Sequence, residues 1–229
     1  MKKGVYSIIL LGLAALLIGG VSDFLYQDPY YLIRPELKIE KIHVTSDKDG
    51  DGITDPDDIL EGARKEIADK TKYRSEYYQG GFPPDDEGVC TDVIWRALKD
   101  AGYDLKTDID EDIRENAEDY PRVNGSPDPN IDFRRVKNQH IFFKKYGLEL
   151  TTEVIPYDAE NLQQWQAGDI VVLERTDHIA IISDKRRKDG VPYIIHNANS
   201  RPKEQNLLMQ WSEANHIIGH FRYPKYDID

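Results

Sequence analysis

The chain has 229 residues, enough for one domain with a sizeable core and a short extra segment, but not for two full catalytic domains. Its 42 acidic residues outnumber its 30 basic ones, and a net charge of -12 argues against a nucleic-acid partner because phosphates would be repelled. The nearest basic cluster, residues 185–188, adjoins Asp189-Gly190 and is typical of a solvated hairpin turn. We therefore expect no nucleic acid.

The sequence begins with an apolar segment. After Met1-Lys2-Lys3, residues 4–21 are small or aliphatic apart from Tyr6 and Ser7, and about 18 apolar residues can span a bilayer. We predict that residues 1–22 are a signal or membrane anchor. An uncleaved anchor is favoured because Gly20-Val21-Ser22 is a weak cleavage pattern. The rest of the chain is then exported, either anchored to the membrane or secreted into the cell envelope or beyond.

Residues 23–46 are rich in Tyr, Pro and charge and predict a linker that ends in a strand-like stretch, 39–44. The next twelve residues, 47–58, carry oxygen ligands at the spacing of a calcium loop, with Gly52 at the sharp-turn position. The predicted ligands are Asp47, Asp49, Asp51, the Ile53 carbonyl, Asp55 and Asp58. The loop resembles dockerin and thrombospondin-type repeats. A flexible acidic linker is the alternative, but it does not explain the regular odd spacing.

The predicted ion is a structural Ca²⁺ that caps the following helix, and no cofactor is expected for catalysis. Position 12 is Asp58 rather than the longer Glu, which predicts weak affinity suited to extracellular calcium.

The remaining residues, 59–229, form the predicted main domain, and the helices come first. Apolar residues recur at helical spacing over 57–73 and 89–101, while residues 79–86 between them are dense in turn formers. Residues 110–120 predict a polar helix. A further helix, with Asp132 as its N-cap and Gly147 as its end, carries an aromatic stripe that predicts core packing.

Strand patterns follow the helices. β-branched and aromatic residues separated by turns predict four short strands, at 169–173, 178–183, 191–197 and 217–223. Helices followed by an antiparallel sheet predict an α+β fold, with the N-terminal helices packed on the C-terminal sheet.

Cys90 is the only cysteine, so it cannot form a disulfide within the chain. It is either a buried small hydrophobe or a nucleophile. Its place at the start of a predicted helix favours the nucleophile, because the unpaired N–H groups there stabilise a thiolate.

Two histidines complete a possible catalytic set. If Ile182 pairs with Pro192 in a hairpin, His178 falls directly opposite His196 on the same face. A nucleophilic thiol needs an imidazole to take its proton and a polar group to hold that imidazole. We therefore predict Cys90, His178 and His196 as catalytic residues. The alternative is a strand-end surface histidine and a satisfied core histidine.

Several segments together carry a resemblance: the helix-initial Cys90, Gly168-Asp169-Ile170-Val171-Val172, Asp177-His178-Ile179-Ala180-Ile181 and Ile195-His196-Asn197. They resemble the papain-like NlpC group of bacterial cell-wall cysteine peptidases. Segments 88–93, 130–136, 168–171 and 219–223 more closely resemble an uncharacterised bacterial envelope family of the same superfamily. The resemblance spans about residues 58 to 224 and implies an NlpC-type fold.

The resemblance also implies roles. Cys90 is the nucleophile, His178 the base and His196 the orienting residue, while the backbone N–H of Cys90 helps to form an oxyanion hole. Arg134 and Arg135 are equally consistent with a clamp for a substrate carboxylate and with a surface ion pair. The expected function is an exported cysteine peptidase or amidase that hydrolyses amide bonds, with peptidoglycan peptides as substrate. The alternatives are a non-catalytic, calcium-dependent envelope-binding module and an acyltransferase that uses the same triad.

Overall fold

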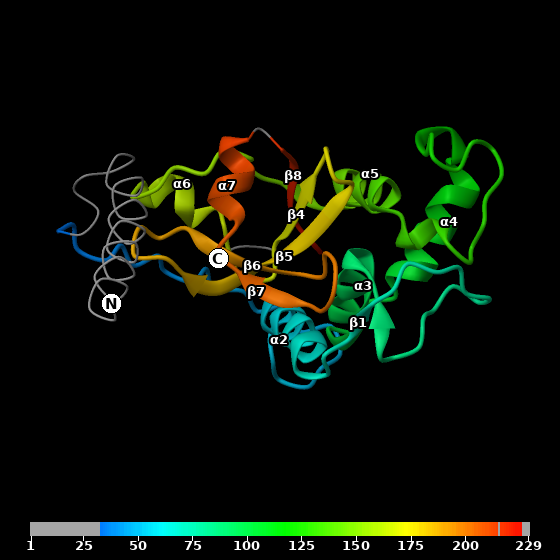
Figure 1. Ribbon diagram of the computed structural model, residues 1–229, viewed down its shortest axis with the longest axis horizontal. Helices are drawn as coiled ribbons and strands as arrows, with labels where there is room; N and C mark the ends of the chain where they lie inside the picture. The colour runs from blue at the N-terminus through cyan, green and yellow to red at the C-terminus, as the bar shows by residue number, and fades with distance from the viewer. Residues whose placement is uncertain (1–32, 215, 226–229) are drawn as a thin grey trace, which may run out of the picture. The chain divides into compact units, whose positions relative to one another are not determined.

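The computed structural model describes residues 33–214 and 216–225 and divides the chain into two units, 1–36 and 37–229. All of the described helices and strands lie in the second unit (Figure 1). The predicted signal or anchor, 1–22, falls outside the described residues. Within the described part, none of the helices combines the length and the apolar character that a membrane crossing requires.

The helices of the first half follow the prediction, with shifted ends. They are α2 (Asp55–Ala68), α3 (Cys90–Asp100), α4 (Leu105–Glu115) and α5 (Val136–Tyr146). Helix α2 is followed by Lys70 in the left-handed region, and the prediction that it continues to residue 73 is wrong. Helix α4 begins five residues before the predicted start, because Asp104 caps it by accepting from the backbone N–H of Thr107.

The predicted N-cap of α5 is also wrong. Asp132 opens a short 3₁₀ turn, η2 (Asp132–Arg134), and Arg135 occupies the N-cap position. A second 3₁₀ turn, η1 (Ala117–Asp119), follows α4. The predicted aromatic stripe packs in part, because Phe133 of η2 and Phe143 of α5 are fully buried whereas Tyr146, at the end of α5, is exposed.

A six-stranded antiparallel sheet forms the second half, in the order β3-β8-β4-β5-β6-β7. Its strands are β3 (Leu148–Glu149), β4 (Ile170–Leu173), β5 (His178–Arg186), β6 (Pro192–His196), β7 (Lys203–Gln205) and β8 (Ile217–Arg222). The predicted α+β arrangement, with helices first and an antiparallel sheet second, is therefore confirmed. Two short strands, β1 (Lys72–Tyr73) and β2 (Glu87–Gly88), pair in parallel beside α3.

Both faces of the sheet are buried, and alternate residues serve two cores. Ile179 and Ile181 of β5 pack with apolar side chains of α2, α3 and α5. Ala180 and Ile182 pack on the other face, where α6 (Ala159–Gln163) and α7 (Leu208–Glu213) contribute. The end of β5 is consequently reached by elements from both sides of the sheet.

The predicted register of the β5–β6 hairpin is wrong by two residues. Ile182 pairs with Ile194 rather than with Pro192, because the hairpin extends to an Arg186–Pro192 pair and β5 carries a bulge on the way. A shift of two residues preserves the face of each side chain. His178 and His196 therefore become diagonal neighbours on one face instead of direct partners.

Part of the predicted linker packs on the domain. Residues 37–46 belong to the second unit, and Val44 is buried. The backbone N–H of Leu37 donates to the Lys188 carbonyl, and the side chain of Ile39 packs with the core on the α7 side. The stretch 39–44 forms no regular strand.

Candidate active site

A buried ion pair fixes the start of α3, where Cys90 lies. Asp92 is fully buried and accepts from the backbone N–H of Val89 at 2.7 Å, which satisfies one unpaired donor of the helix N-terminus. The Arg134 guanidinium holds the same carboxylate through Nε at 2.6 Å and Nη2 at 2.8 Å. Trp95 Nε1 adds a fourth hydrogen bond at 2.8 Å. The position of the thiol thus depends on one carboxylate.

The thiol is enclosed. Cys90 is 8% exposed, and burial raises the pKa of its thiol to about 11, although the N–H groups of Ile179, Thr91 and Cys90 itself act in the opposite direction. The stabilised thiolate expected at a helix N-terminus is therefore outweighed by desolvation. The Ile179 N–H also shows where the sulfur lies, because it places Sγ against the backbone next to His178.

The two predicted histidines do meet. His178 Nε2 lies 2.8 Å from His196 Nδ1, and the ring centroids are 5.0 Å apart. Trp211 of α7 packs edge-on against both imidazoles. Burial lowers the pKa of His178 to about 4, and the neighbouring His196 adds to the effect. His178 is therefore neutral at pH 7, and burial lowers the pKa of His196 as well.

A glutamine at the end of this chain fixes the proton positions. Gln205 Oε1, which can only accept, lies 3.0 Å from His196 Nε2. His196 then carries its proton on Nε2 and accepts at Nδ1 from the protonated Nε2 of His178. The lone pair of His178 is left on Nδ1, the ring nitrogen that remains free to accept a proton. Sequence reasoning missed Gln205, because Lys203-Glu204-Gln205 has little strand propensity.

The link between the thiol and the histidines runs through the backbone, because the N–H that faces Sγ belongs to Ile179, the residue after His178. Over residues 33–214 and 216–225, no hydrogen bond joins Cys90 Sγ to either histidine. Asn197, directly after His196, donates from Nδ2 to the Gly88 carbonyl at 3.1 Å. That bond ties the end of β6 to the segment that leads into Cys90.

A pocket of about 380 Å³ opens beside Cys90 and carries mainly positive charge. Arg122, Arg135 and Lys137 line it, against a single exposed carboxylate, Asp177. Lys137 lies 3.7 Å from that carboxylate, and the buried Arg135 Nε lies 3.2 Å from Oδ1 of the buried Asp132. In a protein of net charge -12, this is a local cationic surface.

The two predicted substrate arginines have different environments. Arg134 has a side chain only 2% exposed, and beyond its two bonds to Asp92 it donates from Nη1 to the Glu76 carbonyl. It is a structural residue of the α3 N-terminus, whereas Arg135 lines the pocket beside Cys90 and pairs with Asp132 at 3.2 Å. His220 is structural as well. It is fully buried, is stacked on Trp165 at 3.7 Å and bonds the Thr151 carbonyl at 2.7 Å.

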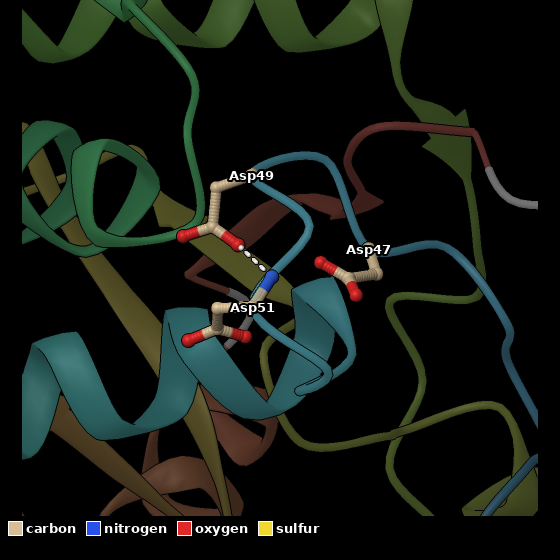
Figure 2. Close-up of side chains that lie close together, drawn as sticks. All are labelled: Asp47, Asp49 and Asp51. Atoms are coloured by element: carbon tan, nitrogen blue, oxygen red, sulfur yellow. Dashed lines mark hydrogen bonds between the residues drawn. The ribbon is translucent and has the colours of Figure 1, made fainter.

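The predicted calcium ligands lie apart from this site. The carboxylates of Asp47, Asp49 and Asp51 are exposed and each offers an oxygen within 4.8 Å of the others (Figure 2). Asp55 is fully buried with both oxygens engaged: Oδ1 accepts from the Lys48 N–H, and Oδ2 from the hydroxyls of Ser46 and Tyr103. Asp58 is 8% exposed, and its Oδ2 has no hydrogen-bond partner.

Comparison with known proteins assigns the domain. Residues 60–223 match the family described as Domain of unknown function (DUF1287). The chain belongs to this family. The DUF1287 domain contains Cys90, His178, His196 and Gln205, whereas the aspartate-rich loop precedes it. The chain is also 36% identical over 174 residues, 72% of its length, to the "Uncharacterized protein YijF" of Escherichia coli (strain K12), of which 80% is covered.

Proposed function

We propose that this protein is an exported cysteine hydrolase that cleaves amide bonds, with Cys90 as nucleophile, His178 as base and His196 as orienting residue. Two observations support the proposal. The thiol at the N-terminus of α3 faces the backbone N–H of Ile179, the residue after His178. The His178 imidazole ends a chain of hydrogen bonds from Gln205 through His196 that leaves its Nδ1 free. The resemblance to NlpC-type peptidases supports the same assignment.

The reaction begins from neutral partners, because burial opposes charge on the thiol and on the imidazole alike. His178 Nδ1 takes the Sγ proton as Sγ attacks the amide carbonyl carbon. His196 accepts from the Nε2–H of the resulting imidazolium and keeps the ring oriented. The backbone N–H of Cys90 faces the developing oxyanion, for which a single donor is worth about 10²-fold or more in rate.

The second half-reaction regenerates the thiol. His178 gives its proton to the leaving amine, which departs and leaves a thioester on Cys90. Water, deprotonated by the same nitrogen, then attacks the thioester and releases the acid. If an amine replaces water at this step the reaction is acyl transfer, and the same residues perform it.

The cationic pocket supports a substrate that carries carboxylates. Arg122, Arg135 and Lys137 place positive charge beside the thiol, where Arg135 pairs with Asp132 at 3.2 Å and Lys137 with Asp177 at 3.7 Å. Peptidoglycan peptides, which have free carboxylates and amide bonds, are the proposed substrate, and the apolar segment 1–22 supports export to the cell envelope. The competing proposal is a non-catalytic envelope-binding module, which is favoured by the enclosed thiol and its raised pKa.

Digestion of purified peptidoglycan by the full-length protein distinguishes these proposals. We expect wild type to release peptide fragments detectable by mass spectrometry, and Cys90→Ala to release none while it keeps its fold by circular dichroism. His43→Ala, an exposed histidine outside the site, serves as the matched control for His178→Ala. Equal release by wild type and Cys90→Ala would refute a cysteine mechanism. Binding to peptidoglycan without release of fragments would favour the binding module.

A further inference from the structure

The loop 47–58 contains a buried carboxylate that nothing in the fold satisfies. Asp58 lies in the first turn of α2, is 8% exposed, and its Oδ2 has no hydrogen-bond partner. A buried carboxylate oxygen without a donor is costly and requires an explanation. Asp57 beside it differs, because it accepts from Lys41 and from the Thr54 hydroxyl at 2.9 Å.

Asp58 closes the loop that begins at Asp47 and lies in the first turn of α2. The loop thus holds three exposed carboxylates whose oxygens lie within 4.8 Å of one another and, at its end, one buried carboxylate with an unpartnered oxygen. Such an arrangement is unfavourable by itself and becomes favourable when a cation lies between the groups.

The spacing of the oxygens fits calcium. Two oxygens on opposite sides of Ca²⁺ are about 4.6–5.2 Å apart at its usual bond lengths. The oxygens of Asp47, Asp49 and Asp51 all lie within 4.8 Å of one another, and all three residues are exposed, so water can complete the coordination. Magnesium holds oxygens closer and keeps more water, and therefore gains less from such a set.

Asp55 is unsuited to be a ligand. Both of its oxygens already accept hydrogen bonds, from the Ser46 hydroxyl, the Lys48 N–H and the Tyr103 hydroxyl. Asp55 therefore connects the loop to the rest of the domain. Gly102 completes the attachment at the end of α3, because a Cβ there would meet Asp49 Cβ at 3.0 Å. The loop therefore packs against the far end of the helix that begins with Cys90.

We propose that this loop binds one calcium ion through Asp47, Asp49, Asp51, the Ile53 carbonyl and Asp58, and that Asp55 is not a ligand. The ion supplies the missing partner of Asp58 and fastens the loop to α2 and to the end of α3. The site is independent of the proposed catalysis, since none of its ligands contributes to the pocket beside Cys90.

Titration of the full-length, chelator-treated protein with calcium alone tests the site. We expect one ion per chain by calorimetry, and a melting temperature raised by about 5–10 °C at calcium 100-fold above its dissociation constant. Magnesium should give a smaller rise. Absence of binding at 10 mM calcium would overturn the proposal.

The substitution Asp58→Asn should stabilise the calcium-free protein but weaken its binding of calcium. Asp58→Asn removes a repelled, unpartnered charge, so it should raise the melting temperature of the calcium-free protein while it weakens calcium binding about tenfold or more. Glu118→Gln, an exposed acid outside the loop, should change neither. Unchanged calcium affinity in Asp58→Asn would refute the ligand set. If that variant fails to fold, the exposed Asp49→Asn decides by the same affinity criterion.

Discussion

Replacement of Asp92 by asparagine should destabilise the protein more than any surface change. The fully buried carboxylate accepts from Arg134 Nε and Nη2, from the Val89 N–H and from Trp95 Nε1. Asparagine has one acceptor oxygen in place of two and no charge. The Arg134 guanidinium, whose side chain is 2% exposed, is then left buried without a counterion. Breaking a buried pair in this way costs about 3–5 kcal/mol.

The cost is large enough to measure in two ways. For a domain of this size each kcal/mol corresponds to about 2–4 °C, so the melting temperature should fall by about 6–20 °C. Urea titration should show the same loss at an unchanged m-value. Arg114→Gln is the control, because its exposed pair with Glu111, 3.7 Å apart, should contribute less than about 1 kcal/mol.

A double-mutant cycle tests the origin of the loss. Arg134→Met alone leaves the Asp92 carboxylate buried with only two neutral donors, and should be about as damaging as Asp92→Asn. The double variant should lose clearly less stability than the sum of the two single losses, because neither charge is then left buried without its partner. Additive losses, or single losses below about 1 kcal/mol, would refute the view that this ion pair fixes the start of α3.

Further predictions concern the proposed chemistry. Iodoacetamide should label Cys90 about 100-fold more slowly at pH 7 than a thiol of pKa 9, and the labelling rate should rise tenfold per pH unit. The urea-unfolded chain should react at the rate of an ordinary thiol. Fast labelling of the folded protein would show that the thiol is ionised. Activity should be lost on acidification near pH 4 rather than near 6.5, as the lowered pKa of His178 requires. His178→Ala should cost nearly as much kcat as Cys90→Ala, and His196→Ala less. Gln205→Ala should lower kcat about tenfold with little change in KM, because the imidazole tautomers are no longer fixed; an unchanged kcat would remove Gln205 from the site.

The strand pattern correctly predicted that His178 and His196 lie on one face of the sheet, although the predicted register of the hairpin was wrong. The turn between β5 and β6 was expected to be longer than it is, and no sequence signal reveals the bulge before Arg186. Only even shifts keep both side chains on one face, and the observed shift is even. His178 and His196 therefore still meet, although as diagonal neighbours. The face of a strand residue was predictable here, whereas its exact partner was not.

Residues that position the proposed catalytic side chains were harder to predict from the sequence. Asp92 lies three positions after the N-cap of α3, where an acidic side chain commonly reaches back to the cap, so local sequence could have indicated it. Its partner Arg134 is more than forty residues away, and nothing in a single sequence joins them. Gln205 could not be predicted because its strand has only three polar residues, with neither apolar periodicity nor β-branched side chains.

Burial gives the proposed site a particular electrostatic character. The raised pKa of Cys90 and the lowered pKa of His178 have the same cause, because an enclosed site opposes charge of either sign. A resting thiolate–imidazolium pair is then disfavoured, and charge has to separate as the substrate reacts. A carboxylate bound by Arg135 and Lys137 would offset the positive charge of the pocket and stabilise the imidazolium that forms on His178. An acidic substrate would thus assist its own cleavage, so a neutralised analogue should lose kcat as well as affinity.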